Sequence, residues 1–349
     1  MSAAPLLSER PSVRLRETWS VTLDEAPVAL RWALHLHVLA AAPAEGDIVL
    51  LDVGDSRIAR RWAGHDGGNF ALDWHPELQR FATGGGDGLV RVWAADEGTP
   101  LREMNAGTGW VEHVAWSRGH PYTAARLAVG AGKDVRVWGP DFALEREWRA
   151  HGAVLDLQWN PLLALFVTTH RSGLQMWIPE QDDEPHDIDY PGAVLTVRWS
   201  SCGRMFAVGN HDATASVIHV ATMKCLRLGG FAGKVAHLAW EPEGRALAGA
   251  GGSVISVWDL KANAEDNELA LPLEGHTAPI AALAWQPDGS LLASGGHDAR
   301  LLLWHPQEEL LPILFRPLTA PVTQQAWSPD GRHLAVGTRD GRITLFTVE

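Results

Sequence analysis

Cysteine is almost missing from this sequence, whose 349 residues include only Cys202 and Cys225. Two cysteines cannot form a disulfide framework, so we expect a reducing compartment and place the protein in the cytoplasm. Long apolar runs are missing as well. None approaches the ~18 residues of a membrane-spanning helix, and the N-terminus has no apolar stretch typical of a signal peptide. These absences predict a protein without a membrane partner.

Positive charge is also scarce, with 29 Lys and Arg against 42 Asp and Glu and a formal net charge of -13. Nucleic-acid phosphates bind to basic surfaces, so we expect no nucleic-acid partner. The few basic residues are mostly arginine, 25 against 4 lysines, and alanine and glycine are abundant. This bias indicates a GC-rich genome and favours a bacterial source.

Tryptophan, in contrast, is abundant, with 17 residues against 2 tyrosines. Eight of the tryptophans recur at intervals of 40 to 45 residues: Trp32, Trp74, Trp116, Trp159, Trp199, Trp240, Trp285 and Trp327. A repeat period in this range is typical of solenoids, propellers and arrays, in which each repeat is one structural unit.

Each repeat predicts three β-strands and a weaker fourth. A short apolar run ends at the marker Trp, and a turn such as SPDG, a small apolar stretch and an alternating strand follow. The last of these strands ends 18 or 19 residues after the marker Trp in seven units, and 22 residues after it in the third. The last unit has no fourth strand, whereas residues 13–19 have that pattern alone. A closed ring, in which this N-terminal strand completes the last blade, would remove the unpaired strand edges that an open array exposes.

These units resemble WD40 repeats. The Trp-Asp dipeptide stands once, at Trp258-Asp259, and Gly-His pairs end at His65 and His276. The resemblance implies a network of His, Ser or Thr, Asp and Trp within one blade. Two units carry complete sets at the same spacing: His65, Thr83, Asp87 and Trp93, and His276, Ser294, Asp298 and Trp304.

We therefore predict an all-β fold, a closed β-propeller of WD40 type with eight four-stranded blades. Residues 13–349 form this single domain, after a short extension at 1–12. Seven blades are the alternative, in which the first unit would be dropped, since its third strand ends in Leu51-Asp52 and its turn has no Asp.

Catalytic chemistry is not indicated by these sets. A Ser-His-Asp triad needs an exposed nucleophile beside an oxyanion site, whereas a network that recurs in two blades serves the fold. Phosphate-binding, HExxH, CxxC and EF-hand motifs are missing. We predict neither an enzyme nor a cofactor.

Two positions in the repeat indicate a partner-binding rim at the end of the ring that is the top face in WD40 proteins. Six residues before the marker Trp, six units have a small residue or Pro. The other two have Trp110 and Lys234. Trp and Arg often anchor interfaces, so we predict one ligand-facing rim of Trp110, Phe231, Lys234, Arg171, Arg339, His170, His211 and His297. The alternative for Trp110 and Phe231 is that they fill gaps between blades.

The leading functional hypothesis is a non-enzymatic scaffold that binds partner proteins through this rim. Acidic loops at 179–190 and 261–270 favour a basic partner, and the long turn at 117–127 is a further docking place on the opposite face. The alternative is a propeller that binds a metal ion or small ligand on the three rim histidines, although they are expected to lie far apart. His35 and His37 are expected on one strand, where packing explains them.

Overall fold

The protein is described here by a computed structural model, which defines residues 13–35, 37–118, 124–181, 183–260, 270–287 and 289–349. The expected extension at 1–12, most of the loop at 261–270 and the middle of the turn at 117–127 lie outside these residues.

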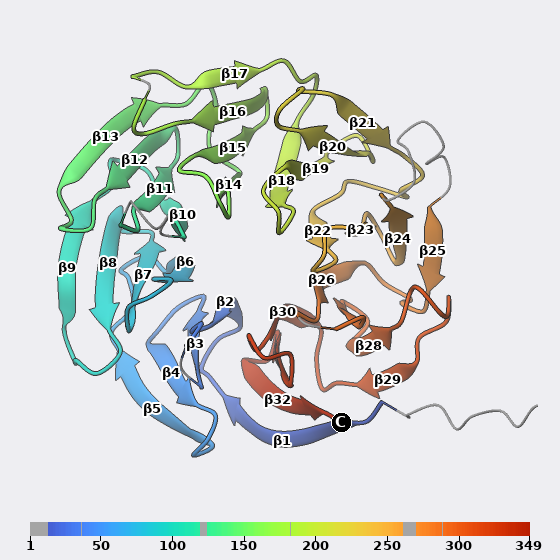
Figure 1. The fold of residues 1–349 in the computed structure, drawn as a ribbon. Helices are drawn as coiled ribbons and strands as arrows, with labels where there is room; N and C mark the ends of the chain where they lie inside the picture. Colours follow the sequence, from blue (N-terminus) through green and yellow to red (C-terminus); the bar gives the residue numbers. More distant parts are fainter. Residues whose placement is uncertain (1–12, 36, 119–123, 182, 261–269, 288) are drawn as a thin grey trace, which may run out of the picture.

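The chain folds into eight antiparallel sheets of four strands, arranged as blades around one axis (Figure 1). Blades 1 and 2 comprise β2 (Pro27–Trp32), β3 (Val38–Pro43), β4 (Ile48–Asp52) and β5 (Arg57–Trp62), then β6 (Asn69–Trp74), β7 (Arg80–Gly85), β8 (Leu89–Ala94) and β9 (Pro100–Asn105). Blades 3 and 4 comprise β10 (Val111–Trp116), β11 (Leu127–Ala131), β12 (Asp134–Trp138) and β13 (Leu144–Arg149), then β14 (Asp156–Trp159), β15 (Phe166–His170), β16 (Gly173–Trp177) and β17 (His186–Ile188).

The second half of the chain repeats the arrangement. Blades 5 and 6 comprise β18 (Val194–Trp199), β19 (Met205–Asn210), β20 (Ala215–His219) and β21 (Cys225–Leu228), then β22 (His237–Trp240), β23 (Ala246–Ala250), β24 (Val254–Asp259) and β25 (Leu271–Glu274). Blades 7 and 8 comprise β26 (Ile280–Trp285), β27 (Leu292–Gly296), β28 (Arg300–Trp304) and β29 (Leu314–Pro317), then β30 (Val322–Trp327), β31 (His333–Thr338), β32 (Arg342–Val348) and, from the start of the chain, β1 (Leu15–Thr22).

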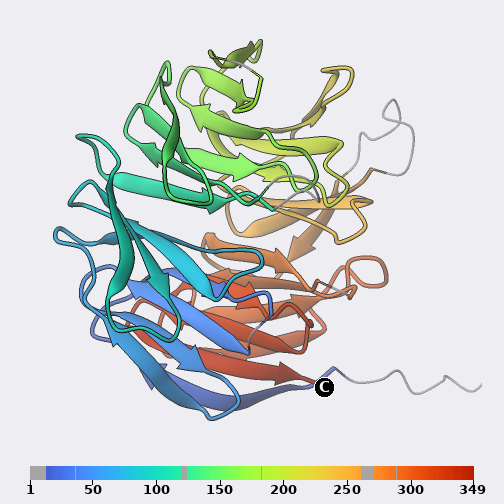
Figure 2. The ribbon, with the colours of Figure 1, turned by 60° about the vertical axis from the view of Figure 1, so that its left-hand side comes forward.

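The ring closes within blade 8, where β1 pairs antiparallel with β32. Beyond the strands, the Arg14 amide donates to the Glu349 carbonyl at 2.8 Å and the Glu349 amide donates back at 2.9 Å. The C-terminus therefore lies beside the beginning of β1 (Figures 1 and 2). The predicted eight blades and the N-terminal closing strand are confirmed. The seven-blade alternative is wrong, because the first unit forms a complete sheet from β2 to β5.

The hydrophobic cores lie between neighbouring blades. Trp62 of blade 1, for example, packs against two residues of blade 2, with its ring centroid 5.3 Å from that of Phe81 and 6.0 Å from that of Trp93. A single blade cannot bury both of its faces, so each depends on its neighbours and the closed ring leaves no blade at an end.

The marker tryptophans join the blades around the axis. The Trp74 indole N–H donates to the carbonyl of Arg31, which directly precedes the marker Trp of the previous blade, at 3.0 Å. Trp32 makes the same bond to Ala326 at 3.0 Å and so links blade 1 to blade 8. Seven of the eight indoles donate in this way, over 2.8 to 3.2 Å. Trp116 is the exception, since its buried Nε1 has no hydrogen-bond partner. This recurring bond explains why the repeat is marked by Trp.

Candidate functional site

The complete set in blade 7 forms one directed chain of hydrogen bonds. The Trp304 indole N–H donates to Ser294 Oγ at 2.8 Å, and Ser294 Oγ lies 2.8 Å from His276 Nε2. The Asp298 carboxylate can only accept, so Nδ1 carries the ring proton and donates to Asp298 Oδ1 at 3.0 Å. Nε2 of the neutral ring then accepts from the Ser294 hydroxyl, which in turn accepts from the Trp304 indole. The order of donors leaves one tautomer of neutral His276.

Blade 2 repeats this arrangement with threonine in place of serine. Trp93 donates to Thr83 Oγ1 at 2.9 Å, Thr83 lies 2.9 Å from His65 Nε2, and His65 Nδ1 lies 2.8 Å from Asp87. Burial lowers the pKa of both His65 and His276, which keeps both rings neutral. A glycine beside each ring leaves room for it. A Cβ at Gly296 would collide with the His276 ring.

Blade 5 builds a related network from a residue that sequence reasoning missed. Tyr190 lies nine residues before its marker Trp, the position that His65 and His276 occupy in their own units. Its hydroxyl donates to Ser216 Oγ at 2.8 Å and accepts from Asn210 Nδ2 at 2.6 Å. Alignment of the repeats on the marker Trp would have revealed Tyr190 as a third polar residue at this position.

Phe231 occupies the same position in blade 6, and its placement on the partner-binding rim needs correction. Its ring centroid lies 5.1 Å from that of Trp258, and the ring belongs to the core around that residue. An apolar contact thus replaces the polar network in this blade, as the gap-filling alternative predicted. Phe231 is part of the blade packing and not an open binding residue.

The top rim consists of the loops that precede the first strands together with the turns between second and third strands. Successive strands of a blade run in opposite directions, so both sets lie at the same end of the ring. Backbone hydrogen bonds join them: the amide of His211 donates to Ala193, that of His297 to Pro279 and that of Arg339 to Pro321, over 2.8 to 3.0 Å. The two positions singled out from the sequence are therefore neighbours within a blade.

Trp110 is the most prominent side chain of the top rim. It is 62% exposed, and its ring centroid lies 5.5 Å from that of Phe70 on the preceding blade. Phe70 supports one part of the indole and the rest faces solvent. Trp110 therefore does not fill a gap in the core. Phe70 was not among the predicted residues, although it is the one aromatic residue found four positions before a marker Trp.

The remaining rim candidates divide into exposed and buried side chains. Arg171, His211, Lys234, His297 and Arg339 are all exposed. They stand on blades 4 to 8, whereas Trp110 stands on blade 3, so the structure spreads these residues around the rim and does not gather them at one point.

The structure contradicts the predicted place of His170 on the rim, because this side chain is only 2% exposed. Its Nδ1 lies 3.0 Å from Ser172 Oγ, and its ring centroid lies 6.4 Å from that of His151. Burial lowers the pKa of His170, so the ring stays neutral between its neighbours. As the last residue of β15, it faces into the blade and away from a ligand.

The histidine ring proposed as a metal or small-ligand site receives no geometric support. His170 is buried within blade 4, while His211 and His297 belong to blades 5 and 7. Over the residues that the structure defines, no three His, Cys, Asp or Glu side chains are grouped so that they could hold a metal ion. The rim therefore presents an aromatic side chain and several cations.

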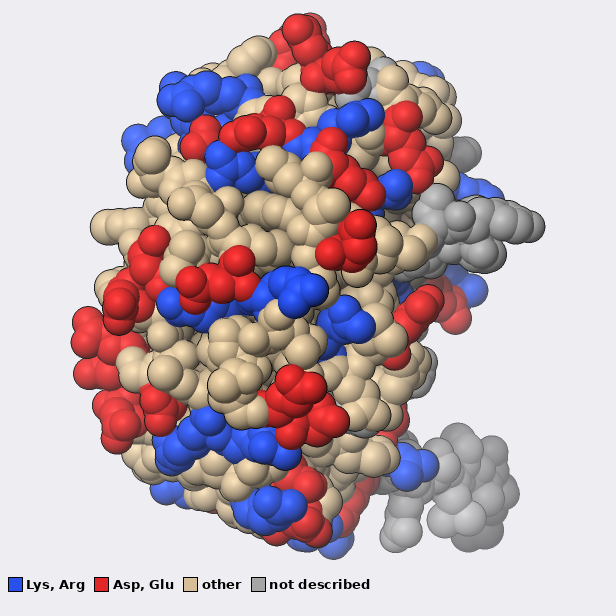
Figure 3. Space-filling model, turned by 90° about the vertical axis from the view of Figure 1, so that its left-hand side faces the viewer, with Lys and Arg blue, Asp and Glu red and all other residues tan. Residues whose placement is uncertain are grey.

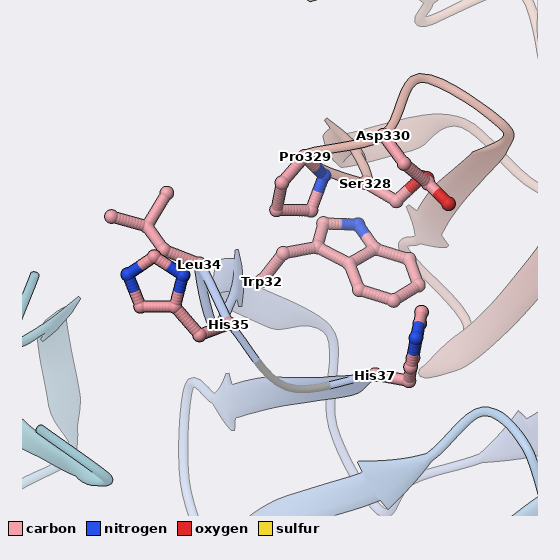
Figure 4. A pocket seen from close by; sticks show the side chains of 7 residues that line it. All are labelled: Trp32, Leu34, His35, His37, Ser328, Pro329 and Asp330. Atoms are coloured by element: carbon pink, nitrogen blue, oxygen red, sulfur yellow. The ribbon is translucent and has the colours of Figure 1, made fainter. Parts of the chain in front are cut away.

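A small hollow lies at the opposite end of the ring, where blades 1 and 8 meet. Figure 4 shows the Trp32 indole with Pro329 above it and His37 beside it, while His35 lies farther out next to Leu34. Both histidines lie in the turn between β2 and β3, so the expectation that they share a strand is wrong. Ser328 and Asp330 complete the lining, but Ser328 Oγ already donates to Asp330 Oδ1 at 2.6 Å.

The outer surface carries both signs of charge. On the side formed by the outer strands β5, β9 and β13, Lys and Arg alternate with Asp and Glu (Figure 3). In the acidic loop at 179–190, Glu180 accepts a hydrogen bond from Arg126 at 2.8 Å and Asp187 lies 3.3 Å from His151. Part of the acidic charge that favoured a basic partner is therefore balanced within the chain.

Three segments of the chain, residues 57–94, 267–305 and 313–347, match the family model described as WD domain, G-beta repeat. These three segments, about a third of the chain, resemble WD40 repeats. Among solved structures, the crystal structure of the computationally designed Ika8 protein has a TM-score of 0.79 and 20% sequence identity, with 95% of this chain and 99% of that chain covered. At this identity, the likeness shows the fold alone.

Curated relatives match parts of this chain. Ribosome assembly protein 4 of Chaetomium thermophilum is 41% identical over 63 residues, 18% of this chain and 12% of that protein. Eukaryotic translation initiation factor 3 subunit I of Drosophila grimshawi is 24% identical over 177 residues, 47% of this chain and 54% of that protein. Protein transport protein sec13 of Emericella nidulans is 24% identical over 159 residues, 38% of this chain and 52% of that protein. The chain thus spans about half or less of the length of each relative. All three come from eukaryotes and give no support to a bacterial source.

Within the described part of the chain, no helix is long and apolar enough to cross a membrane. Both cysteines are free and exposed.

Proposed function

We propose that this chain is a non-enzymatic scaffold of the cytoplasm, a rigid WD40 propeller that holds partner proteins on its top rim. The observation that carries the proposal is Trp110, an indole 62% exposed on the rim and supported from below by Phe70. Large exposed aromatic side chains on a rigid frame lose little conformational freedom when they bind, and they often dominate the energy of an interface.

The networks support a role without catalysis. Ser294 and Thr83 are both 0% exposed, and each hydroxyl is held between a Trp and a His, so neither oxygen can reach a substrate. The names of the three relatives also support the proposal, since they designate a ribosome assembly protein, a subunit of a translation initiation factor and a transport protein. Parts of this chain resemble proteins whose names imply assembly with others.

The chemistry of the top rim bears on the partner. The exposed side chains of Arg171, Lys234 and Arg339 would meet carboxylates of a partner that covers the rim, with Trp110 as the apolar anchor. Most of the acidic loop at 179–190 is not part of the top rim, and we propose this loop as the contact for a basic segment of a partner protein. The arginine-rich composition keeps a bacterial host in the proposal.

The test is affinity capture from host lysate with the full chain as bait, followed by a binding measurement between the purified chain and each captured protein. The variant Trp110→Ala should weaken that binding at least about thirtyfold, the loss expected for an interface anchor. Leu311→Ala, a similarly exposed apolar residue of blade 7 at 69% exposure, is the matched control and should bind as the parent does.

The charged part of the rim is tested by a Lys234→Glu/Arg339→Glu double variant, which should slow association more than it speeds dissociation. A purified partner that binds the parent, Trp110→Ala and the double variant equally would refute the rim as its site. Binding that disappears only with a chelator would instead favour the metal-dependent alternative.

A further inference from the structure

The eight residues that directly precede the marker tryptophans lie on the innermost strands of the ring and are called the axis tier here. They are Arg31, Asp73, Ala115, Gln158, Arg198, Ala239, Ala284 and Ala326. None of them is buried, although the residue on their N-terminal side is buried in seven of the eight blades. Solvent therefore reaches the axis of the ring at this level, and the axis tier faces it.

The charges of the axis tier are unevenly placed. Its two cations, Arg31 and Arg198, stand on blades 1 and 5, which are four steps apart in either direction around an eight-blade ring. They face one another from opposite walls, while blades 6 to 8 contribute only alanine. Desolvation lowers the pKa of Arg31, the carboxylate of Asp73 raises it, and the positive charge of Arg198 lowers it. Two like charges that face one another favour an anion between them.

Most N–H donors of the Arg31 side chain make no hydrogen bond to the described residues, and its one hydrogen bond goes to a backbone carbonyl. Its Nη1 donates to the carbonyl of its neighbour Leu30 at 3.1 Å, and no carboxylate of the described residues lies within ion-pair distance of it. A guanidinium carries five N–H donors in a planar fork that suits carboxylate and phosphate. The side chain is therefore charged and accessible to solvent, and the carboxylates of Asp73 and Asp156 act on it only from a distance.

The two carboxylates at the axis are already engaged by the protein. Asp156 Oδ2 accepts from Arg198 at 2.6 Å, from the Thr196 hydroxyl at 2.8 Å and from the Val197 amide at 3.0 Å. Asp73 Oδ2 accepts from the Trp116 amide at 2.8 Å, and burial raises the pKa of Asp73 to about 6. Arg198 is thus partly neutralised, so Arg31 is the principal hydrogen-bond donor to a bound anion.

We propose that the central channel binds a small oxyanion, a phosphate or a carboxylate, on the guanidinium of Arg31 with Arg198 facing it from the opposite wall. The alanines of blades 6 to 8 add no charge to this level of the channel. Asp73 limits its affinity, because this carboxylate repels the bound anion from the neighbouring blade. The site is distinct from the top rim and does not depend on the scaffold function.

The experiment is a calorimetric titration of the full chain with inorganic phosphate and, separately, with succinate. Ionic strength is held constant, because salt screens such contacts. One saturable site is expected. Arg31→Gln should weaken binding at least about tenfold, the effect of losing a charged hydrogen-bond donor. Asp73→Asn should strengthen binding, since the amide can still accept from the Trp116 amide while the repulsion disappears.

Arg60→Gln removes an exposed cation of the outer strand β5, outside both proposed sites, and is the control, which should bind as the parent does. Far-UV circular dichroism checks that each variant is folded. Saturable binding of both phosphate and succinate supports a general oxyanion site. Saturable binding of only one supports the site and shows whether it prefers phosphate or carboxylate. No saturable binding to the parent chain overturns the proposal, and so does equal affinity of the parent and Arg31→Gln, or weaker binding by Asp73→Asn.

Discussion

Replacing Ser294 by alanine is the sharpest test of the directed hydrogen-bond chain in blade 7. The substitution removes one buried oxygen that serves two partners, the indole N–H of Trp304 and Nε2 of His276. Both partners are buried, so water cannot replace the hydroxyl. An orphaned buried polar group costs roughly 1–3 kcal/mol, and two such groups give a loss of roughly 2–6 kcal/mol. That is a large part of the roughly 5–15 kcal/mol typical of a folded domain.

The assay is equilibrium unfolding in guanidinium chloride, followed by tryptophan fluorescence and circular dichroism together. Ser294→Thr is the matched control, because Thr83 makes the same bonds in blade 2 and the threonine variant should stay close to the parent. The double variant Ser294→Ala/Trp304→Phe removes the orphaned indole N–H along with its acceptor. Its loss should therefore be smaller than the sum of the two single losses.

The reasoning is wrong if Ser294→Ala changes the free energy of unfolding by less than about 0.5 kcal/mol, the scatter of neutral surface substitutions. It is also wrong if the losses of the two single variants simply add. Either result would mean that the hydroxyl does not link Trp304 to His276.

Three further predictions concern the rest of the fold. The free energy of unfolding should be constant above pH ~6.5 and decrease below it, because burial lowers the pKa of His75 and His237 to about 4 and the unfolded chain binds protons first. Thermal melts from pH 7.5 to 5 measure this decrease. A melting temperature that rises on acidification would contradict it. Trp116→Phe should lower the free energy of unfolding by about 1 kcal/mol less than Trp159→Phe, because only Trp159 loses an indole hydrogen bond, of 2.9 Å. Unfolding in urea compares the two variants. Equal losses of stability would mean that the Trp159 bond contributes nothing. Deletion up to residue 22 removes β1 and exposes the edge of β32. The truncated chain should aggregate, as measured by light scattering, or lose its cooperative transition in a thermal melt. A monomer as stable as the parent would refute the closing role of β1.

The fold could be predicted almost completely because its key bonds depend on local spacing. A marker Trp at each inner strand, a turn after it and a second marker 18 to 22 residues later, aromatic in six units, all lie within one repeat. The closing strand could be inferred too, because residues 13–19 show a fourth-strand pattern with no strands before it. The four-residue networks of blades 2 and 7 were expected from the resemblance to WD40 repeats, since both units carry the matching residues at the same spacing.

The rim was harder to predict, because a position in the repeat does not determine exposure. His170 and His211 hold equivalent positions before their turns, yet one is buried and the other is exposed. The difference arises from neighbours that a single repeat does not contain, such as Ser172 and His151 beside the His170 ring. Phe231 was placed wrongly for a similar reason, since the adjacent Trp258 turns an apparent anchor into core packing.

The axis tier escaped sequence reasoning because the fold makes no demand on its side chains. The carbonyls of seven of these residues, and not their side chains, accept the indole N–H of the next blade: Trp74 binds the carbonyl of Arg31, and Trp285 binds that of Ala239. Asp73 is the exception, since the indole of Trp116 has no partner. Arginine and alanine thus serve the ring equally well at this position. A charged side chain that the ring does not require, on an inner wall that water reaches, is free to serve a ligand, and this is why Arg31 and Arg198 stand out against the alanines of blades 6 to 8.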